Sequence, residues 1–484
     1  MLPRIVGVGV TPLSQGAAGA AAPTPTALIL QALRLALADA GGGATSASRG
    51  LQLSDLDGLI ALPSLMGSEQ FMMAHAVAGA AGLFEARQGR RTIVRTLDVG
   101  GAGPVAALLM AARMVAHEGC GSVAVVAGDT PGSATLEEFL ARADAACRLP
   151  GPEPLTRAAA TPALASRASR SGGLAGGSGS SKSADTSGGG GSGVAAAADQ
   201  WTVPSPVIPN LYDVIARWQM ARHGVTREQL AMVASLMTLQ ASRHPLALQR
   251  RPRTVKQVLS SRQVAPVATA LECAKRVDGA AAIIVASPAF ARQHGLPEAR
   301  AVEVLGGGEA SGPPVPPADI TDTMYASAAQ AAAAAFADAG VAPGQVHYWS
   351  LYDCFPVCFI RALEAVGLAP EGGGGRYVER AYKAAASGDG GAAARAGGEG
   401  QHGLQALPPQ DFPINTHGGL LGLGAPWEVP AMHGIAEAVS QLRGDAGDRQ
   451  VPGARRALVY GNGGILSASA VAILGRCNAP SAKL

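Results

Sequence analysis

Three consecutive residues, Tyr352, Asp353 and Cys354, bring a phenol, a carboxylate and a thiol together at the end of a predicted strand. A tyrosine side chain can transfer a proton, but its ordinary pKa of about 10 makes it a poor base unless a neighbouring donor or cation lowers that pKa. A cysteine is a nucleophile only as its thiolate. We expect Tyr352 to be an acid or base, Asp353 to cap the helix that follows, and Cys354 to be a small buried residue rather than a nucleophile.

A second polar group precedes a pair of glycines in PINTHGGLLGLG, residues 413–424. It consists of Asn415, Thr416 and His417. A histidine titrates near neutral pH, so His417 is the best candidate for acid–base chemistry in this stretch. A purely structural role, in which the imidazole only caps a turn, is an equal alternative.

The segment TLDVGGAGPVAALLMAARMVAHEGCGSVAVVAGDT, residues 96–130, predicts a turn, a helix and a buried strand. A proline opens the helix, apolar residues recur at helical spacing, and a glycine ends it. A glycine turn at the start of a buried helix is a place where backbone amides can stabilise a developing negative charge. The turn DVGGAGP contains no Cys, Ser or Thr. It is therefore a site that works without a nucleophile, a site that has lost one, or only a turn.

Strands and helices alternate on either side of these segments. A first round of elements is expected at residues 4–13, 26–41, 56–62, 92–99 and 277–287. Two helical stretches, residues 211–224 and 226–245, predict a helical subdomain. A second round follows at residues 301–310, 322–340, 346–355, 357–367 and 456–474. Two successive rounds, with helices on both sides of sheets, favour a duplicated α/β architecture.

The composition excludes several classes of protein. The 484 residues are 48% hydrophobic and 15% charged, with a net charge of +3, which gives no electrostatic case for binding nucleic acid. The six cysteines form no Cys-x-x-Cys pair, and they indicate a reducing compartment. We recognise neither a secretion signal nor an apolar run long enough to span a membrane.

Two segments rich in small residues, 167–193 and 384–401, have nothing to bury and are predicted to be disordered insertions. We expect a first half at residues 1–300, with a loop domain at about 131–264, and a second half at residues 301–484. The tripeptide Ala482-Lys483-Leu484 resembles the Ser-Lys-Leu address of peroxisomal proteins. Peroxisomal import is the expectation, with a frayed tail on a cytoplasmic protein as the alternative.

Several segments in this order resemble the thiolase superfamily, particularly the sterol-carrier-protein-type thiolases. They are IVGVGVTP, residues 96–130, VDGAAAIIVAS, LYDCFPVCFIRALEAVGL, PINTHGGLLGLGAP, EAVSQLRG and YGNGGILSASAVAIL. The resemblance covers nearly the whole chain outside the two insertions. It implies a five-layered αβαβα sandwich of two similar halves with a helical loop domain. It also implies a homodimer or homotetramer, a coenzyme A thioester as substrate, and no metal or other cofactor.

The same resemblance exposes departures in the loops that carry thiolase chemistry. The family's nucleophilic cysteine would stand at Gly101, and the histidine of its Gly-His-Pro loop would stand at Ala425. The C-terminal loop, where a second cysteine is usual, offers Tyr460 or Asn462. Because activation of a cysteine by histidine needs both members, their joint loss argues against ordinary Claisen or thiolytic chemistry.

Sterol-carrier-type thiolases read His-Asp-Cys-Phe where this chain has Tyr352-Asp353-Cys354-Phe355. A Tyr-Asp pair is similar to that of thiolase-like aldolases of steroid side-chain degradation, which lack the nucleophilic cysteine, use tyrosine as acid or base and use a zinc-ribbon/OB-type partner. Their second tyrosine is absent here, and Glu428 stands near its place. Trp427 and Glu428 could also simply anchor the loop.

Three hypotheses follow from these residues. The first is non-covalent retro-aldol cleavage with Tyr352 and His417 as acid and base, and the second is acyl transfer with Cys354 as substitute nucleophile. The third is a non-catalytic scaffold that binds acyl coenzyme A. We expect further residues to contact the substrate, namely Asp353, Asn415, Gly418, Gly419, Gly101, Ala425 and Glu428.

Overall fold

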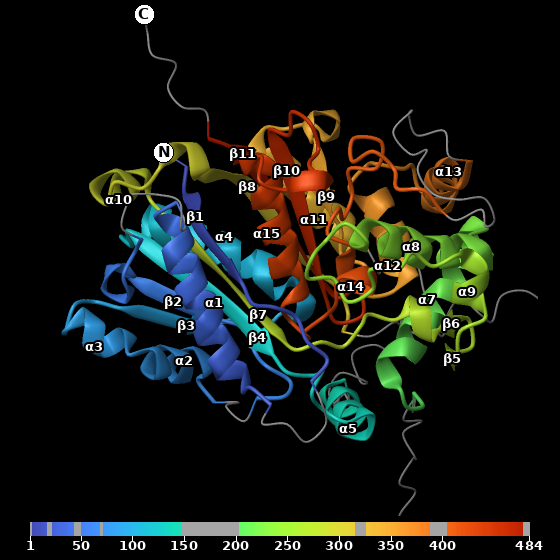
Figure 1. Ribbon diagram of the computed structural model, residues 1–484, viewed down its shortest axis with the longest axis horizontal. Helices are drawn as coiled ribbons and strands as arrows, with labels where there is room; N and C mark the ends of the chain where they lie inside the picture. Colours follow the sequence, from blue (N-terminus) through green and yellow to red (C-terminus); the bar gives the residue numbers. More distant parts are fainter. Residues whose placement is uncertain are drawn as a thin grey trace, which may run out of the picture.

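Nine strands form one mixed sheet through the molecule (Figure 1). The computed structural model describes residues 2–16, 22–42, 50–67, 71–147, 203–314, 326–387 and 404–477. Across the sheet the strands follow the order β3 (Ile93–Thr96), β2 (Gly58–Ala61), β4 (Ser122–Asp129), β7 (Gly279–Ala286), β1 (Arg4–Val10), β8 (Val302–Ser311), β11 (Ala468–Arg476), β10 (Arg456–Gly463) and β9 (Tyr348–Ser350).

The sheet consists of two halves of similar construction that meet at β1 and β8. Arg4 pairs with Glu303 and Ile5 with Val302 in antiparallel register. In the first half β2 runs parallel to β3 and β4, and in the second half β9 runs parallel to β10, while the remaining pairs are antiparallel. The repetition confirms the duplicated α/β architecture expected from the sequence.

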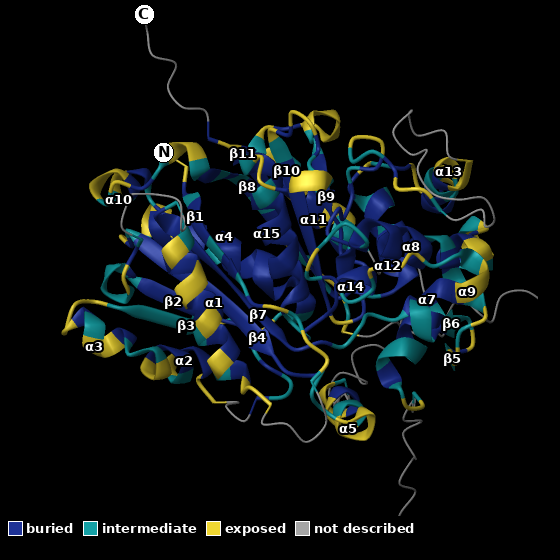
Figure 2. Cartoon of the chain, viewed as in Figure 1, coloured by how far each residue is buried: buried dark blue, intermediate teal, exposed yellow. Residues whose placement is uncertain are grey.

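Two helices lie between the halves and form the central layer. They are α4 (Gly103–His117) and α15 (Pro430–Arg443), which pack against each other and against strands of both halves. Nearly every residue of α15 is buried (Figure 2), as expected of a helix covered on all sides. The outer layers are α1 (Pro25–Ala40), which covers β1, β4 and β7, and α11 (Ser327–Ala339), which covers β8 and β11. These layers give the expected five-layered αβαβα sandwich.

The outer helix α1 shows how the sequence sets such an element. Thr24 caps it by accepting a hydrogen bond from the amide of Ala27 at 3.1 Å, and Pro25 occupies its first turn. Only one face is buried, so exposed and buried stripes alternate along the helix in Figure 2. Three further helices lie in the first half: α2 (Met73–Ala81), which covers β2 and β3, α3 (Leu83–Arg87) and α10 (Pro288–Gln293).

A helical subdomain lies beside the second half of the sheet (Figure 1). It contains α7 (Val207–His223), α8 (Arg227–Ala241), α9 (Val255–Leu259), α12 (Pro356–Ala365), α13 (Gly374–Ser387), α14 (Gly419–Gly422) and the small hairpin of β5 (Gln263–Ala265) and β6 (Ala268–Thr269). The predicted helices at 211–224 and 226–245 are α7 and α8. A separate helix, α5 (Leu136–Ala146), packs against α7.

Three boundaries differ from those expected. Residues 456–474, expected to form a glycine turn and a final strand, belong to a hairpin of two strands, β10 and β11, because the glycine-rich stretch between them turns the chain back. The first strand ends at Val10 rather than residue 13. Residues 384–387 belong to the last turn of α13, not to an insertion. The predicted insertion at 167–193, the remainder of the second at 388–401, and Ala482-Lys483-Leu484 lie outside the described residues.

Within the described residues no helix is both long and apolar enough to cross a lipid bilayer.

Candidate active site

A cavity of about 550 Å³ opens among the segments at or just beyond the carboxyl ends of β2, β3, β9 and β10. In α/β proteins the carboxyl ends of parallel strands are the usual place for a ligand. Helices α5 and α7 complete the wall. Five of the ten residues expected to take part in catalysis or substrate binding line this cavity: Gly101, Tyr352, Cys354, Ala425 and Glu428.

Gly101 and Tyr352 touch at the start of α4. A Cβ atom added to Gly101 would lie 2.6 Å from Cζ of Tyr352 and closer still to the Tyr352 hydroxyl. It would also lie 2.5 Å from the backbone oxygen of Asn462. Real Cβ atoms do not approach other atoms this closely, so position 101 accepts no side chain while Tyr352 keeps its place. The phenol hydroxyl therefore fills the space where a side chain at position 101 would begin.

Burial fixes the protonation state of Tyr352. Loss of water raises its pKa well above the usual value, and the negative charges that Cys354 and Glu428 can carry raise the pKa further. A tyrosine that acts as a base needs a donor or cation that lowers its pKa, and the structure gives the opposite shift. At neutral pH the phenol keeps its proton, so Tyr352 is suited to donate a hydrogen bond rather than to take a proton.

Glu428, expected from the sequence to contact substrate or to anchor its loop, is a titratable group of the cavity wall. Its Oε2 atom is buried, and among the described residues it has no hydrogen-bond partner. Burial, together with the charges of Asp98 and Asp129, raises the pKa of Glu428 to about 8. A carboxylate with such a pKa is a stronger base than an ordinary glutamate and is still partly ionised at neutral pH.

The chain presents Glu428 through an unusual backbone conformation. Trp427 has a φ of 46°, in the left-handed region that few side chains adopt. Its indole packs edge-on against Phe139, with ring centroids 6.0 Å apart, and the guanidinium of Arg276 lies 4.9 Å from the centre of the Phe139 ring. This packing holds Trp427 in its strained conformation and thereby fixes the direction in which the Glu428 side chain points.

Asn415, Asp353 and Gly419 support the site from behind and do not line the cavity. The Asn415 amide donates to the oxygen of Leu351 at 2.7 Å and accepts from the amide of Leu351 at 2.8 Å, so it clamps the residue before Tyr352. Asp353 accepts hydrogen bonds from the amides of Leu420 at 2.8 Å and Leu421 at 3.3 Å. It therefore caps α14, not the following helix α12 as expected, because α14 packs across the loop.

Burial raises the pKa of Asp353 to about 7, against the opposing effect of those two amides.

Two glycines, Gly418 and Gly419, allow the start of α14 to pack closely against its neighbours. Gly418 and Gly419 have φ values of 101° and 60°, and a Cβ on Gly419 would lie 2.5 Å from Cγ of Asp353. These two glycines, expected to contact substrate, instead permit close packing, Gly419 against Asp353 and Gly418 against Ala241 of α8.

His417 lies outside the cavity wall. Its Nδ1 is 3.5 Å from the Tyr348 hydroxyl, and burial lowers its pKa to about 4 despite the opposing charge of Glu437. Its neighbour Thr416 donates to Glu437 at 2.7 Å, and Arg449 forms a 3.0 Å ion pair with Glu437. The imidazole thus stays neutral inside a buried polar network, as in the structural alternative for this residue.

Cys354 and Asn462 complete the wall near Tyr352. The Cys354 sulfur lies 3.4 Å from that of Cys358, and no histidine lines the cavity within the part of the chain that the structure describes. Asn462 donates from Nδ2 to the Tyr212 hydroxyl at 3.0 Å. Tyr460, the other candidate in this loop, has its hydroxyl 3.4 Å from that of Ser469 and does not line the cavity. Sequence reasoning gave Asn462 no definite role.

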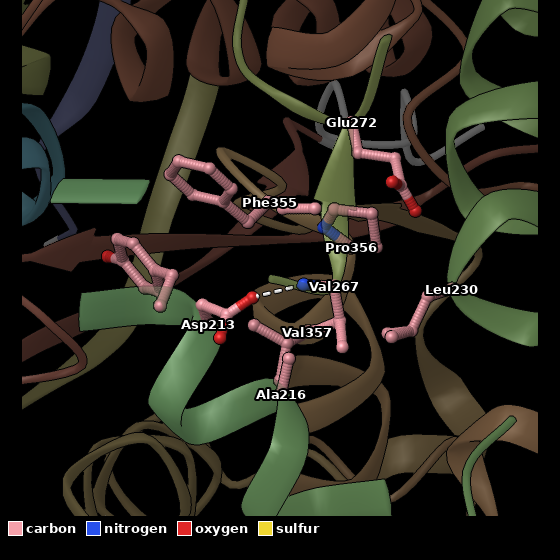
Figure 3. Close-up of a pocket in the computed structure, with 10 residues that line it drawn as sticks. Asp213, Ala216, Leu230, Val267, Glu272, Phe355, Pro356 and Val357 are labelled. Carbon is pink, nitrogen blue, oxygen red and sulfur yellow. Dashed lines mark hydrogen bonds between the residues drawn. The ribbon is translucent and has the colours of Figure 1, made fainter. Parts of the chain in front are cut away.

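A second hollow, between α7 and α8, holds only about 20 Å³. Figure 3 shows Asp213 accepting a hydrogen bond from the amide of Val267, at 2.6 Å, beside apolar side chains that include Val357 and Leu230. A space of this size admits one water molecule at most. Among the described residues no group of three or more His, Cys, Asp and Glu could hold a metal ion.

Comparisons with known proteins agree with this architecture. A family model described as thiolase C-terminal domain-like matches residues 317–398 and 381–476. An acetyl-CoA acetyltransferase of Methanothermobacter thermautotrophicus is 34% identical over 286 residues, which are 58% of this chain and 68% of that protein. Sterol carrier protein 2 of Bos taurus is 30% identical over 263 residues, 54% of this chain. That match spans only 44% of sterol carrier protein 2.

Two solved structures share the fold. The Ltp2-ChsH2(DUF35) aldolase superposes with a TM-score of 0.66 at 21% identity, over 99% of this chain and 98% of that chain. A monomeric SCP2-thiolase like protein type 1 from Mycobacterium smegmatis gives a TM-score of 0.61 at 20% identity, over 99% of this chain and 78% of that chain. With the five layers, the family model and the acetyltransferase relative, the conclusion is that this chain belongs to the thiolase superfamily.

Proposed function

We propose that this protein cleaves the bond between C2 and C3 of a 3-hydroxyacyl coenzyme A thioester, by retro-aldol chemistry without a covalent acyl-enzyme. The observation that carries the proposal is the Tyr352 hydroxyl, which fills the place of a nucleophile at Gly101 in a cavity that also holds Glu428. The acetyl-CoA acetyltransferase relative is named for a coenzyme A thioester, which supports this class of substrate.

Glu428 is the base in this proposal. Its ionised carboxylate takes the proton of the 3-hydroxyl, and the C2–C3 bonding electrons move onto C2 as C3 becomes a carbonyl carbon. The products are an aldehyde or ketone and the enolate of the shortened thioester. Protonation of C2 by the same carboxyl group then yields the shortened acyl coenzyme A and restores Glu428, so neither a metal nor an acyl-enzyme is needed.

Tyr352 stabilises the enolate. Its raised pKa keeps the phenol protonated, so the hydroxyl can donate a hydrogen bond to the thioester oxygen as negative charge develops there. The hydroxyl also lies at Gly101, in the turn that leads into α4. The amino end of this 15-residue helix carries a partial positive charge, which favours an anion at the same point.

Acyl transfer is the second candidate, because the thiol of Cys354 does line the cavity. It would need activation that no neighbouring histidine supplies, since Ala425 stands in the wall at the family's histidine position. A partner subunit is part of our proposal as well, because the similar aldolase is named for two components, Ltp2 and ChsH2(DUF35). We therefore propose activity assays with and without a zinc-ribbon/OB-type partner.

The test is product analysis with a 3-hydroxyacyl coenzyme A. Mass spectrometry follows the shortened thioester, and a hydrazine reagent traps the carbonyl fragment. We expect equal amounts of both products, and a loss of about 10²- to 10⁴-fold in rate for Glu428→Gln. The exposed Glu371→Gln provides a matched control with unchanged rate. Absence of cleavage with and without the partner, while the thioester still binds, would replace the proposal with the scaffold hypothesis.

A further inference from the structure

We propose that Asn462 selects hydroxylated acyl groups, by accepting a hydrogen bond from the 3-hydroxyl of the thioester bound in the cavity. The inference rests on the proposed function, since it concerns the same cavity and the same class of substrate. Asn462 stands near the end of β10, is only 2% exposed and lines the cavity wall. Its backbone oxygen adjoins the point where Gly101 and Tyr352 meet, so Asn462 stands at the reacting end of the cavity.

The Asn462 amide carries an oxygen without a partner. Its Oδ1 atom is buried and accepts no hydrogen bond from any described residue. A buried acceptor in this state costs free energy in the empty protein, and a ligand that brings a donor removes this cost. Oε2 of Glu428, in the same wall, is also buried and has no hydrogen-bond partner among the described residues. Two residues of the cavity wall therefore each hold a buried oxygen without a partner, and a ligand whose donor reaches such an oxygen removes the cost.

The hydrogen bonds of Tyr212 determine which end of the amide is unpaired. The Tyr212 hydroxyl lies 2.7 Å from the carbonyl oxygen of Gly464 and 3.0 Å from Asn462 Nδ2. A phenol has one hydrogen, and a carbonyl can only accept, so this hydrogen goes to Gly464. Tyr212 must then accept from Asn462, which places Nδ2 on that side and Oδ1 on the other. Tyr212 is in this sense a positioning residue for Asn462.

The donor that fits Oδ1 is the hydroxyl that Glu428 later deprotonates. While Glu428 is protonated it cannot take up this proton, whereas Oδ1 of Asn462 can accept a hydrogen bond from the hydroxyl. A saturated acyl group of the same length offers no donor at this place, and a 3-oxo group offers only an acceptor. The unpaired Oδ1 of Asn462 would repel the oxygen of a 3-oxo group. Asn462 thus favours the aldol-type substrate over the 3-oxo substrate of a thiolase reaction.

The test measures binding rather than turnover. Dissociation constants are compared for a 3-hydroxyacyl coenzyme A and the saturated thioester of equal chain length, with Glu428→Gln as the background so that the ligand is not cleaved. We expect a preference of about tenfold for the hydroxylated ligand, the value of one neutral hydrogen bond. Asn462→Leu in this background should abolish the preference and leave the affinity for the saturated thioester within about twofold.

Two further variants sharpen the result. Tyr212→Phe releases the amide orientation and should reduce the preference, whereas Tyr460→Phe, in the same strand but outside the cavity, should leave it intact. A preference that survives Asn462→Leu would overturn the proposal. An equal loss of affinity for both thioesters in Asn462→Leu would also overturn the proposal, because the donor would then lie on the pantetheine that both ligands share. Because binding needs no cleavage, this outcome is separate from failure of the retro-aldol reaction.

Discussion

The hydroxyl of Tyr352 occupies the space that the Cβ atom of any larger residue at position 101 would need. Glycine at this position is therefore more than the loss of a nucleophile, because it makes room for the phenol. In the mechanism that we propose, the pair replaces a covalent catalyst with a hydrogen-bond donor at the amino end of α4.

Gly101→Ala should destabilise the protein by about 1–3 kcal/mol, because the added methyl group overlaps Tyr352. Urea unfolding measures the change. The double variant Gly101→Ala/Tyr352→Ala should be less destabilised than the sum of the two single variants, since the overlap is gone. Strict additivity in this double-mutant cycle would mean that the two residues do not share one space.

Tyr352→Phe should lower the rate of cleavage by about 10²- to 10³-fold, the usual effect of removing one donor from an oxyanion site. The ring stays in the core, so the free energy of unfolding should change by less than about 1 kcal/mol. Tyr348→Phe is the matched control, because its hydroxyl is buried beside His417 and outside the cavity. Equal rates for Tyr352→Phe and the wild type would remove Tyr352 from the mechanism.

The rate should depend on pH through Glu428. Its pKa is raised to about 8 and its ionised form is the base, so kcat/KM should rise with pH and level off above that value. Asp98→Asn removes one of the charges that raise this pKa and should move the midpoint to lower pH. A rate that falls as pH rises toward 8 would instead assign Glu428 the role of an acid.

Buried histidines should make the fold sensitive to acid. Neither ring nitrogen of His433 has a partner among the described residues, and burial lowers its pKa to about 3, with the charges of His417 and His244 acting in the same direction. The folded state therefore binds fewer protons than the unfolded state between this value and about 6.5. Stability present at neutral pH is lost as pH falls through that window, by about 2 kcal/mol at pH 5 for this one group.

His433→Met should stabilise the protein by about 1 kcal/mol at pH 7, because methionine leaves no polar atom unpaired, and by more at pH 5. Urea unfolding at the two pH values measures both changes. The exposed His117→Gln serves as control and should leave the pH dependence unchanged. A variant that is less stable than the wild type at pH 5 would show that the His433 imidazole finds partners.

The sequence predicted the architecture better than the chemistry. Alternating strands and capped helices indicated two α/β halves, because periodicity and caps are local signals. The sign of the Tyr352 pKa shift could not be read in this way, since burial depends on the whole fold. Asp353 caps a helix 67 positions further along the chain, and such a partner leaves no local pattern. In the sequence His417 and Asn462 look alike, because both are polar residues beside glycines. Only the structure shows that His417 belongs to a buried polar network and Asn462 to the cavity wall.

The central claim is that C–C cleavage proceeds without an acyl-enzyme, and the intact mass of the protein during turnover tests this claim most directly. The protein is mixed with 3-hydroxyacyl or 3-oxoacyl coenzyme A, quenched within one turnover and analysed by mass spectrometry. We predict cleavage of the 3-hydroxyacyl thioester while the protein mass stays unchanged. An added acyl mass that maps to Cys354, with thiolysis of the 3-oxoacyl thioester, would contradict the account and establish acyl transfer.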